Sequence, residues 1–257
     1  MGVVRKTDII ARLQKDILLL QGFKPAAGGH TDAGLKSINY VFPNNTFPLA
    51  AVHEFFTNHP EDIAASCGFI SGITASLMKT GAPCVWVSSS KNIFPPALKA
   101  FGIEPAKIIF IQSKKPKEIL WTVEEALKCA SISTVVGEIS EISFTESRRL
   151  QLAVEKTKVA GFLIRHRPKN LSTACVTRWR VTPIQSLRKP ALVSTQFIEG
   201  LNDEIEMPGL GCPGWNVELL KVRNGKTGSW QMEWREGKFR LINQPVFAVH
   251  KQERKVG

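Results

Sequence analysis

The chain has 257 residues, of which 43% are hydrophobic, enough for one sizeable α/β domain with small additions. Its formal net charge is +12, and residues 141–200 alone contribute +7 from 11 basic and 4 acidic side chains. Five cysteines without a CxxC pair exclude a disulfide framework. The sequence lacks both a signal-peptide pattern and an apolar run of the roughly 18 residues that a membrane span needs. We therefore expect a cytoplasmic protein that binds a polyanionic or acidic partner and no membrane.

Residues 1–31 predict an N-terminal helix and a linker. The helix is indicated by apolar residues at positions 9, 10, 13, 17 and 20, with Thr7 or Asp8 as its cap. The following stretch, KPAAGGHTDAG, breaks this pattern with proline and glycine. We assign residues 32–257 to a single domain.

From about residue 50 to residue 166, short apolar segments alternate with longer helical patterns. The predicted strands cover residues 50–56, 83–88, 107–112, 133–139 and 160–166, and the predicted helices cover residues 61–79, 94–101, 116–129 and 145–159. This alternation is typical of an α/β fold, with a mostly parallel β-sheet and helices on both faces.

The pattern changes after Leu171. TRWRVTPI predicts a further strand, and residues 182–214, rich in Pro, Ser and Gly, predict a long mobile loop. The segment that starts at Trp215 predicts two or three antiparallel strands, with turns at Asn224-Gly225 and Glu236-Gly237. We expect these strands to form a C-terminal hairpin extension, which makes the Gly-Lys-Thr at 225–227 a hairpin tip and not a phosphate site.

The stretch HEFFTNHPEDIAAS has the strand, turn and helix of a phosphate-binding loop but lacks its residues. Residues 57–65 contain neither glycine nor lysine, and Pro60 removes a backbone donor. Losing the lysine and hydroxyl contacts, at about 2 kcal/mol each, weakens nucleotide binding by roughly three decades. Glu61 and Asp62 either favour a helix N-terminus, the interpretation we prefer, or repel a phosphate. We expect no cofactor and no ATPase activity.

Several segments occur in the order found in one known family. These are TDAGLKSINYVFPNNTFPLAAVHEFF, VVGEI, SRRLQLAVE, TRWRV and WNVELLKVRNGKTGSWQMEW, which together span about residues 32–240. Through them the chain resembles the RecA-like superfamily, most closely its ImuA/SulA branch and within it ImuA. The resemblance implies a RecA-like fold and an accessory role in inducible, error-prone translesion DNA synthesis after DNA damage.

The resemblance also implies partners. ImuA-like proteins work with ImuB, an inactive Y-family polymerase relative, and with an alternative replicative-type polymerase; DNA is a further candidate, and self-association is left open. The catalytic residues of RecA-like ATPases do not carry over. Ser88-Ser89-Ser90 stands where a catalytic acid is expected, and Glu138 is the only acid near the Mg²⁺-binding position. We therefore expect a non-catalytic scaffold.

Two other functions stay open. One is a DNA-dependent ATPase of RecA type with an atypical nucleotide site. The other is a SulA-like inhibitor of cell division, although the length of this chain and its tryptophan-rich C-terminal strands favour ImuA.

Basic residues are concentrated where strands of a parallel sheet end, which is the usual place for a binding crevice. As candidates for contact with nucleic acid or an acidic partner we select nine: Arg148, Arg149, Arg165, Arg167, Lys169, Arg178, Arg180, Arg188 and Lys189.

Other chemistry is less favoured. His53, His59 and Cys67 match no common zinc spacing, so we expect no metal site. Cys84 and Cys175 are predicted to be buried thiols and not nucleophiles. The alternating Trp230, Met232 and Trp234 could stack on bases, but core packing is the preferred interpretation.

Overall fold

The computed structural model describes residues 9, 12–13, 33–90, 93–185, 190–193, 205–208 and 211–242. The predicted N-terminal helix and linker, except for single positions, lie outside these residues. Among the residues described, no helix has the length and hydrophobicity needed to cross a membrane.

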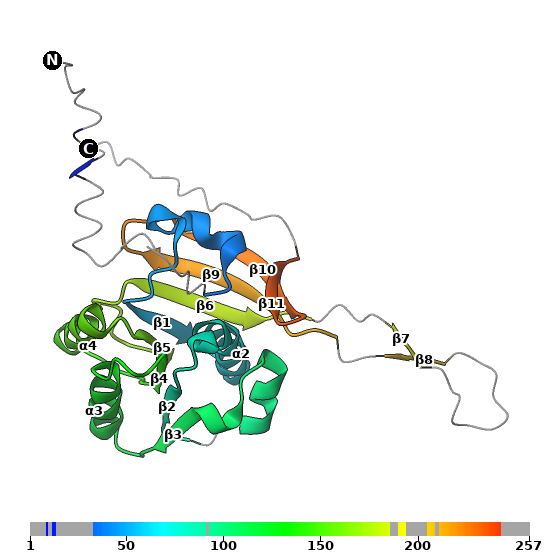
Figure 1. Cartoon of the computed structure of the whole chain (residues 1–257), viewed down its shortest axis with the longest axis horizontal. Coiled ribbons are helices and arrows are strands. Elements are labelled where there is room, and N and C mark those ends of the chain that lie inside the picture. The colour runs from blue at the N-terminus through cyan, green and yellow to red at the C-terminus, as the bar shows by residue number, and fades with distance from the viewer. Residues whose placement is uncertain are drawn as a thin grey trace.

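Six parallel strands form the larger part of one nine-stranded sheet (Figure 1). They are β1 (Val52–Thr57), β2 (Cys84–Ser88), β3 (Ile108–Gln112), β4 (Thr134–Glu138), β5 (Ala160–His166) and β6 (Thr177–Pro183). Their order across the sheet is β6-β1-β5-β4-β2-β3. Strands β1, β2, β4 and β5 are almost entirely buried, which explains their continuous apolar sequences.

The sheet continues beyond β6 with three antiparallel strands. These are β9 (Gly214–Val222), β10 (Gly228–Arg235) and β11 (Lys238–Leu241), which extend the order as β6-β9-β10-β11. The turn between β9 and β10 contains Asn224 and Gly225, so the Gly-Lys-Thr sequence is a hairpin tip, as predicted. The predicted α/β sheet with its antiparallel C-terminal extension is confirmed.

Within the described residues, three α-helices cover the two faces of the sheet. Helix α2 (Pro60–Leu77) lies on one face, while α3 (Pro116–Leu127) and α4 (Phe144–Thr157) lie on the other (Figure 1). Short 3-10 helices η1 (Lys36–Val41), η2 (Pro43–Asn45), η3 (Met78–Thr80), η4 (Pro95–Phe101) and η5 (Pro105–Lys107) complete the connections.

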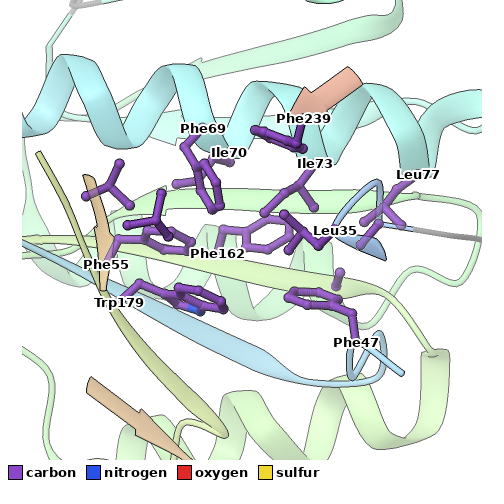
Figure 2. Close-up of a cluster of buried hydrophobic side chains, with 14 of the residues drawn as sticks. Leu35, Phe47, Phe55, Phe69, Ile70, Ile73, Leu77, Phe162, Trp179 and Phe239 are labelled. Atoms are coloured by element: carbon purple, nitrogen blue, oxygen red, sulfur yellow. The ribbon is translucent and has the colours of Figure 1, made fainter. Parts of the chain in front are cut away.

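The largest hydrophobic core lies under α2. Figure 2 shows Phe69, Ile70 and Ile73 of the helix packed over Phe55, Phe162 and Trp179 of the sheet. Gly72 permits this close approach, because a Cβ atom there would come within 2.5 Å of Phe239 and 2.9 Å of Trp234. The helix therefore contacts both the parallel strands and the C-terminal extension.

Two predicted segments differ from the structure. The helix predicted over 94–101 is the 3-10 helix η4, which begins at Pro95-Pro96 and ends at Gly102 with φ of +82°. The loop predicted over 182–214 is shorter at its start, because β6 continues to Pro183, and it contains the antiparallel pair β7 (Pro190–Val193) and β8 (Ile205–Pro208). The rest of that segment, apart from residues 184–185 and 211–213, lies outside the described residues.

Candidate functional site

The turn between β1 and α2 is closed by a carboxylate from the chain itself. Asp62 is buried, and its Oδ2 accepts the backbone N–H groups of Asn58 at 2.9 Å and His59 at 3.0 Å. These are the kind of backbone donors that bind phosphate oxygens in a phosphate loop. Pro60, the first residue of α2, has no N–H to offer. The turn therefore has the frame of an anion site, with its donors already used.

Arg167 fixes the same turn from the end of β5. Its Nε donates to the carbonyl oxygen of Asn58 at 2.7 Å, and its backbone N–H donates to Thr57 O at 2.8 Å. Its φ of +44° lies in the left-handed region, which non-glycine residues seldom adopt. The side chain is exposed and was predicted to contact a partner; in the structure part of its guanidinium group is engaged by the turn.

Glu138 lies at the end of β4, on the face that α2 covers. Burial raises the pKa of Glu138, and Trp86 beside it partly offsets this increase. Its Oε1 has no hydrogen-bond partner within the described part of the chain. Nor do the described residues contain a group of three His, Cys, Asp or Glu side chains that could hold a metal ion.

A buried ion-pair network is centred on Glu54 of β1, the strand that leads into the β1–α2 turn. Glu54 of β1 is completely buried; its Oε2 accepts Nη1–H of Arg165 at 3.0 Å, and its Oε1 accepts Nε–H of Arg178 at 2.8 Å and the hydroxyl of Thr173 at 2.8 Å. Both guanidinium groups lie over the ring of Phe56, with Cζ 5.4 Å (Arg165) and 4.6 Å (Arg178) from its centroid. The network joins β1, β5 and β6 through their side chains.

The expectation for Arg165 changes as a result. Its side chain is completely buried, and it also donates through Nη2 to the carbonyl oxygen of Asn170 at 2.8 Å. Arg178 keeps only 15% of its side chain exposed and also donates to Leu171 O. Because a buried charge must be paired, these two arginines compensate Glu54 and do not form an outer binding surface.

The remaining candidates are dispersed. Arg149 contacts Glu124 of α3, Arg148 lies 4.0 Å from Glu155, and Arg180 lies 3.3 Å from Glu218 of β9. Lys169 is exposed, and its backbone N–H donates to Glu141 at 2.8 Å. Arg188 and Lys189 lie outside the described residues.

Two cations that are not among the nine predicted candidates stabilise the connection between β5 and β6. Lys221 Nζ donates to Thr173 O, and Arg223 Nη2 donates to Ala174 O, each at 3.0 Å. Partial burial lowers the pKa of Lys221. The positive charge of Arg178, which lies opposite Lys221 in the β6–β9 register, lowers it further. Only the pairing of β6 with β9 brings these residues together, so the local sequence carried no signal for them.

Other sequence candidates are structural. His53 is buried between Thr177 and Pro48. Burial raises the pKa of Cys67, Cys84 and Cys175 to about 12, as expected for inert thiols. Core packing is confirmed for the stripe of Trp230, Met232 and Trp234.

The sequence was compared with known proteins. No family model matches the chain. It is similar to Protein ImuA of Caulobacter vibrioides, from strain NA1000 / CB15N and from strain ATCC 19089 / CIP 103742 / CB 15. In both cases 31% of 229 aligned residues are identical, and the alignment covers 82% of this chain and 88% of the relative.

Proposed function

This chain belongs to the ImuA family, and from that premise we propose that it is a non-catalytic scaffold of inducible, error-prone translesion DNA synthesis. Its expected partners are an ImuB-like relative of Y-family polymerases and an alternative replicative-type polymerase, with DNA as a further candidate. On this view the RecA-like sheet holds partners in place and does not convert ATP binding into movement.

The observation that carries the proposal is the internal carboxylate at the β1–α2 turn. A phosphate group would have to displace Asp62 from the backbone N–H groups of Asn58 and His59. Hydrogen bonds to a charged group contribute about 1.5–3 kcal/mol each. When a nucleotide binds, the protein would lose these two hydrogen bonds of Asp62. The nucleotide would gain no contact with a lysine or a glycine from residues 57–65, because none is present there. Two unfavourable effects therefore act against nucleotide binding at the same turn.

We expect MgATP to show no saturable binding up to about 1 mM when titration is followed by calorimetry or by retention of radiolabelled nucleotide. A Kd of about 1 mM corresponds to a binding free energy of only about −4 kcal/mol. Turnover should stay at background with and without single-stranded DNA. Glu138→Gln serves as the matched variant, because it changes the only acid near the Mg²⁺ position without changing its size. DNA-stimulated hydrolysis that disappears in Glu138→Gln would refute the proposal and favour the RecA-type ATPase.

A second candidate function, direct DNA binding, depends on cations that remain exposed. Lys169 and Arg148 fit best, because both are exposed and neither is part of the Glu54 network. The ion pair of Arg148 with Glu155 is long, at 4.0 Å, so it leaves the guanidinium group accessible. The loop that carries Lys169 contacts the segment before α4 through the Asn170 Nδ2 bond to Ile142 O at 2.9 Å. Both residues therefore belong to the region where β5 ends and α4 begins.

The double variant Arg148→Ala/Lys169→Ala should flatten the salt dependence of DNA binding, by about 0.7–0.9 in the log–log slope for each phosphate contact removed. Fluorescence anisotropy with a labelled oligonucleotide at several salt concentrations measures the slope. Lys79→Ala/Lys156→Ala is the control: it removes the same charge from two exposed lysines near the C-terminal ends of α2 and α4, where the parallel strands begin and not where they end. If both double variants keep the wild-type slope, Arg148 and Lys169 make no phosphate contact.

A further inference from the structure

Strand β3 forms an open edge of the sheet with exposed apolar side chains. Among the strands that the structure describes, it is the outermost on its side, and its one partner is β2 (Figure 1). Its sequence, IIFIQ, contains no charge, yet Ile109 is 50% exposed and Phe110 is 42% exposed. Proteins normally protect such an edge with charges, proline, a bulge or a covering segment. Among the residues that the structure describes, none of these devices is present on β3.

The backbone of β3 has hydrogen-bonding groups directed outward. Ser113 donates its backbone N–H to Ser88 O at 3.2 Å, so the alternation of a parallel ladder directs the amides of Ile109 and Ile111 toward β2. The N–H and C=O groups of Ile108, Phe110 and Gln112 then point away from the sheet. The N–H of Ile108 donates to the carbonyl oxygen of Pro105. For the N–H groups of Phe110 and Gln112 and for the three carbonyl oxygens, no backbone partner occurs within the described ranges. The edge can therefore accept one more strand.

The charges around β3 favour one kind of strand. Lys114 and Lys117 follow the strand, are exposed and have no acidic partner within 4.0 Å among the described residues. Lys107 precedes the strand, and Lys115 follows it; both are paired, with Glu104 and Glu118 respectively. A strand that carries acids at its ends would therefore find complementary charge beside an apolar centre.

A second copy of the chain fits this edge poorly. Antiparallel pairing centred on Phe110 would bring Lys107 of each copy next to Lys114 of the other, and parallel pairing in register would place equal lysines side by side. Like charges on neighbouring strands are destabilising.

We propose that the outer edge of β3 is a docking site for an extended segment of a partner protein, apolar over about five residues and acidic at its ends. The segment adds to the sheet as a tenth strand: backbone hydrogen bonds to Phe110 and its neighbours hold it, and the exposed side chains of Ile109 and Phe110 pack against its apolar residues. This site goes beyond the proposed scaffold role and does not depend on whether the chain binds a nucleotide.

The test uses the full chain and two fluorescein-labelled synthetic peptides. Both share the core Val-Thr-Val-Phe-Val; one has two glutamates at each end and the other two lysines at each end. We expect the acidic peptide to bind at least about tenfold more tightly than the basic one in fluorescence anisotropy. In hydrogen exchange, the acidic peptide should slow the amides of Phe110 and Gln112, whereas those of Ile109 and Ile111, already bonded to β2, should not change.

Variants of the edge separate docking from nonspecific adhesion. Phe110→Pro removes an outward N–H and leaves the β2 ladder in place, a position where edge strands tolerate proline. We expect it to weaken acidic-peptide binding by about fivefold or more. Lys114→Glu/Lys117→Glu should also weaken binding of the acidic peptide by about fivefold or more. It should reduce the difference in affinity between the acidic and the basic peptide. Trp121→Ala removes a 63% exposed apolar side chain from α3 and should leave binding unchanged.

If Phe110→Pro fails to fold, Phe110→Lys tests the same edge with an intact backbone. Equal binding of both peptides, or acidic-peptide binding that survives Phe110→Lys at full strength, would overturn the proposal. A concentration-dependent dimer in sedimentation that Phe110→Lys abolishes would also overturn it, because the edge would then belong to a second copy of the chain.

Discussion

Glu54→Ala should lower the free energy of unfolding by about 3–5 kcal/mol, the usual cost of leaving buried charges without their partner. The carboxylate is completely buried and accepts hydrogen bonds from Arg165, Arg178 and Thr173. Without it, the completely buried guanidinium group of Arg165 keeps its contact with Asn170 O but lies 3.8 Å from its nearest remaining acid, Glu141. Urea unfolding followed by circular dichroism measures the change.

Two variants control this experiment. Glu218→Ala also removes the carboxylate partner of an arginine, but this pair is partly exposed at the surface of β6 and β9, so its loss should cost about 1 kcal/mol or less. Glu54→Gln keeps the size of the side chain and removes its charge, so it should fall between the alanine variant and the wild type. If Glu54→Ala were no more destabilising than Glu218→Ala, the buried network would contribute nothing to stability.

Acidification from pH 7 to pH 5 should cost about 2 kcal/mol of stability through His53 alone. Burial lowers the pKa of His53 to about 3 in the folded protein, well below the ordinary value of 6.5. The unfolded chain therefore takes up a proton as the pH falls below 6.5, and the folded chain does not. The contribution of neutral His53 to stability is complete above pH 6.5 and declines by about 1.4 kcal/mol per pH unit toward pH 3.

The contacts of His53 explain why its ring stays neutral. Pro48 O, 2.9 Å from Nε2, can only accept a hydrogen bond, so Nε2 carries the proton. Nδ1 then accepts from the hydroxyl of Thr177 at 2.7 Å, and that hydroxyl oxygen accepts the indole N–H of Trp179 at 2.7 Å. A proton on Nδ1 would break this chain of hydrogen bonds inside the core.

The matched variant is His53→Gln, which keeps a polar side chain but does not titrate. The difference in unfolding free energy between wild type and variant should shrink by about 2 kcal/mol between pH 7 and pH 5. Other groups titrate equally in both proteins, so they cancel in this difference. Stability curves that run parallel over this pH range would show that His53 is protonated in the folded state.

The parallel half of the fold could be predicted from the sequence because its signals are local. The continuous apolar segments of β2 and β5 and the helical periodicity of α3 and α4 gave boundaries within two residues of those observed. The segment of η4 could not be assigned correctly, because Pro95 and Pro96 permit a helical start while the tighter 3-10 geometry depends on packing. The order of the strands, with β1 between β5 and β6, is a tertiary property that periodicity does not encode.

The candidate surface was harder to predict, for a physical reason. The density of arginines in residues 141–200 indicated a cationic surface, but Arg165 meets a carboxylate 111 positions away in the sequence, and Arg149 one that is 25 positions away. Charge counted along the chain overlooks partners that only the fold brings close. At the β1–α2 turn, by contrast, the preferred interpretation of Asp62 as an acid that favours a helix N-terminus is confirmed. Its carboxylate accepts the backbone N–H groups of Asn58 and His59, just before α2.

The continuity of the sheet from β3 to β11 sets the width of the molecule. Eight spacings of about 4.8 Å between neighbouring strands place its outermost strands about 38 Å apart. That span is comparable to the diameter of a small globular domain. A segment docked on the outer edge of β3 would therefore lie about 38 Å from any contact made along β11, too far for one short peptide to reach both edges.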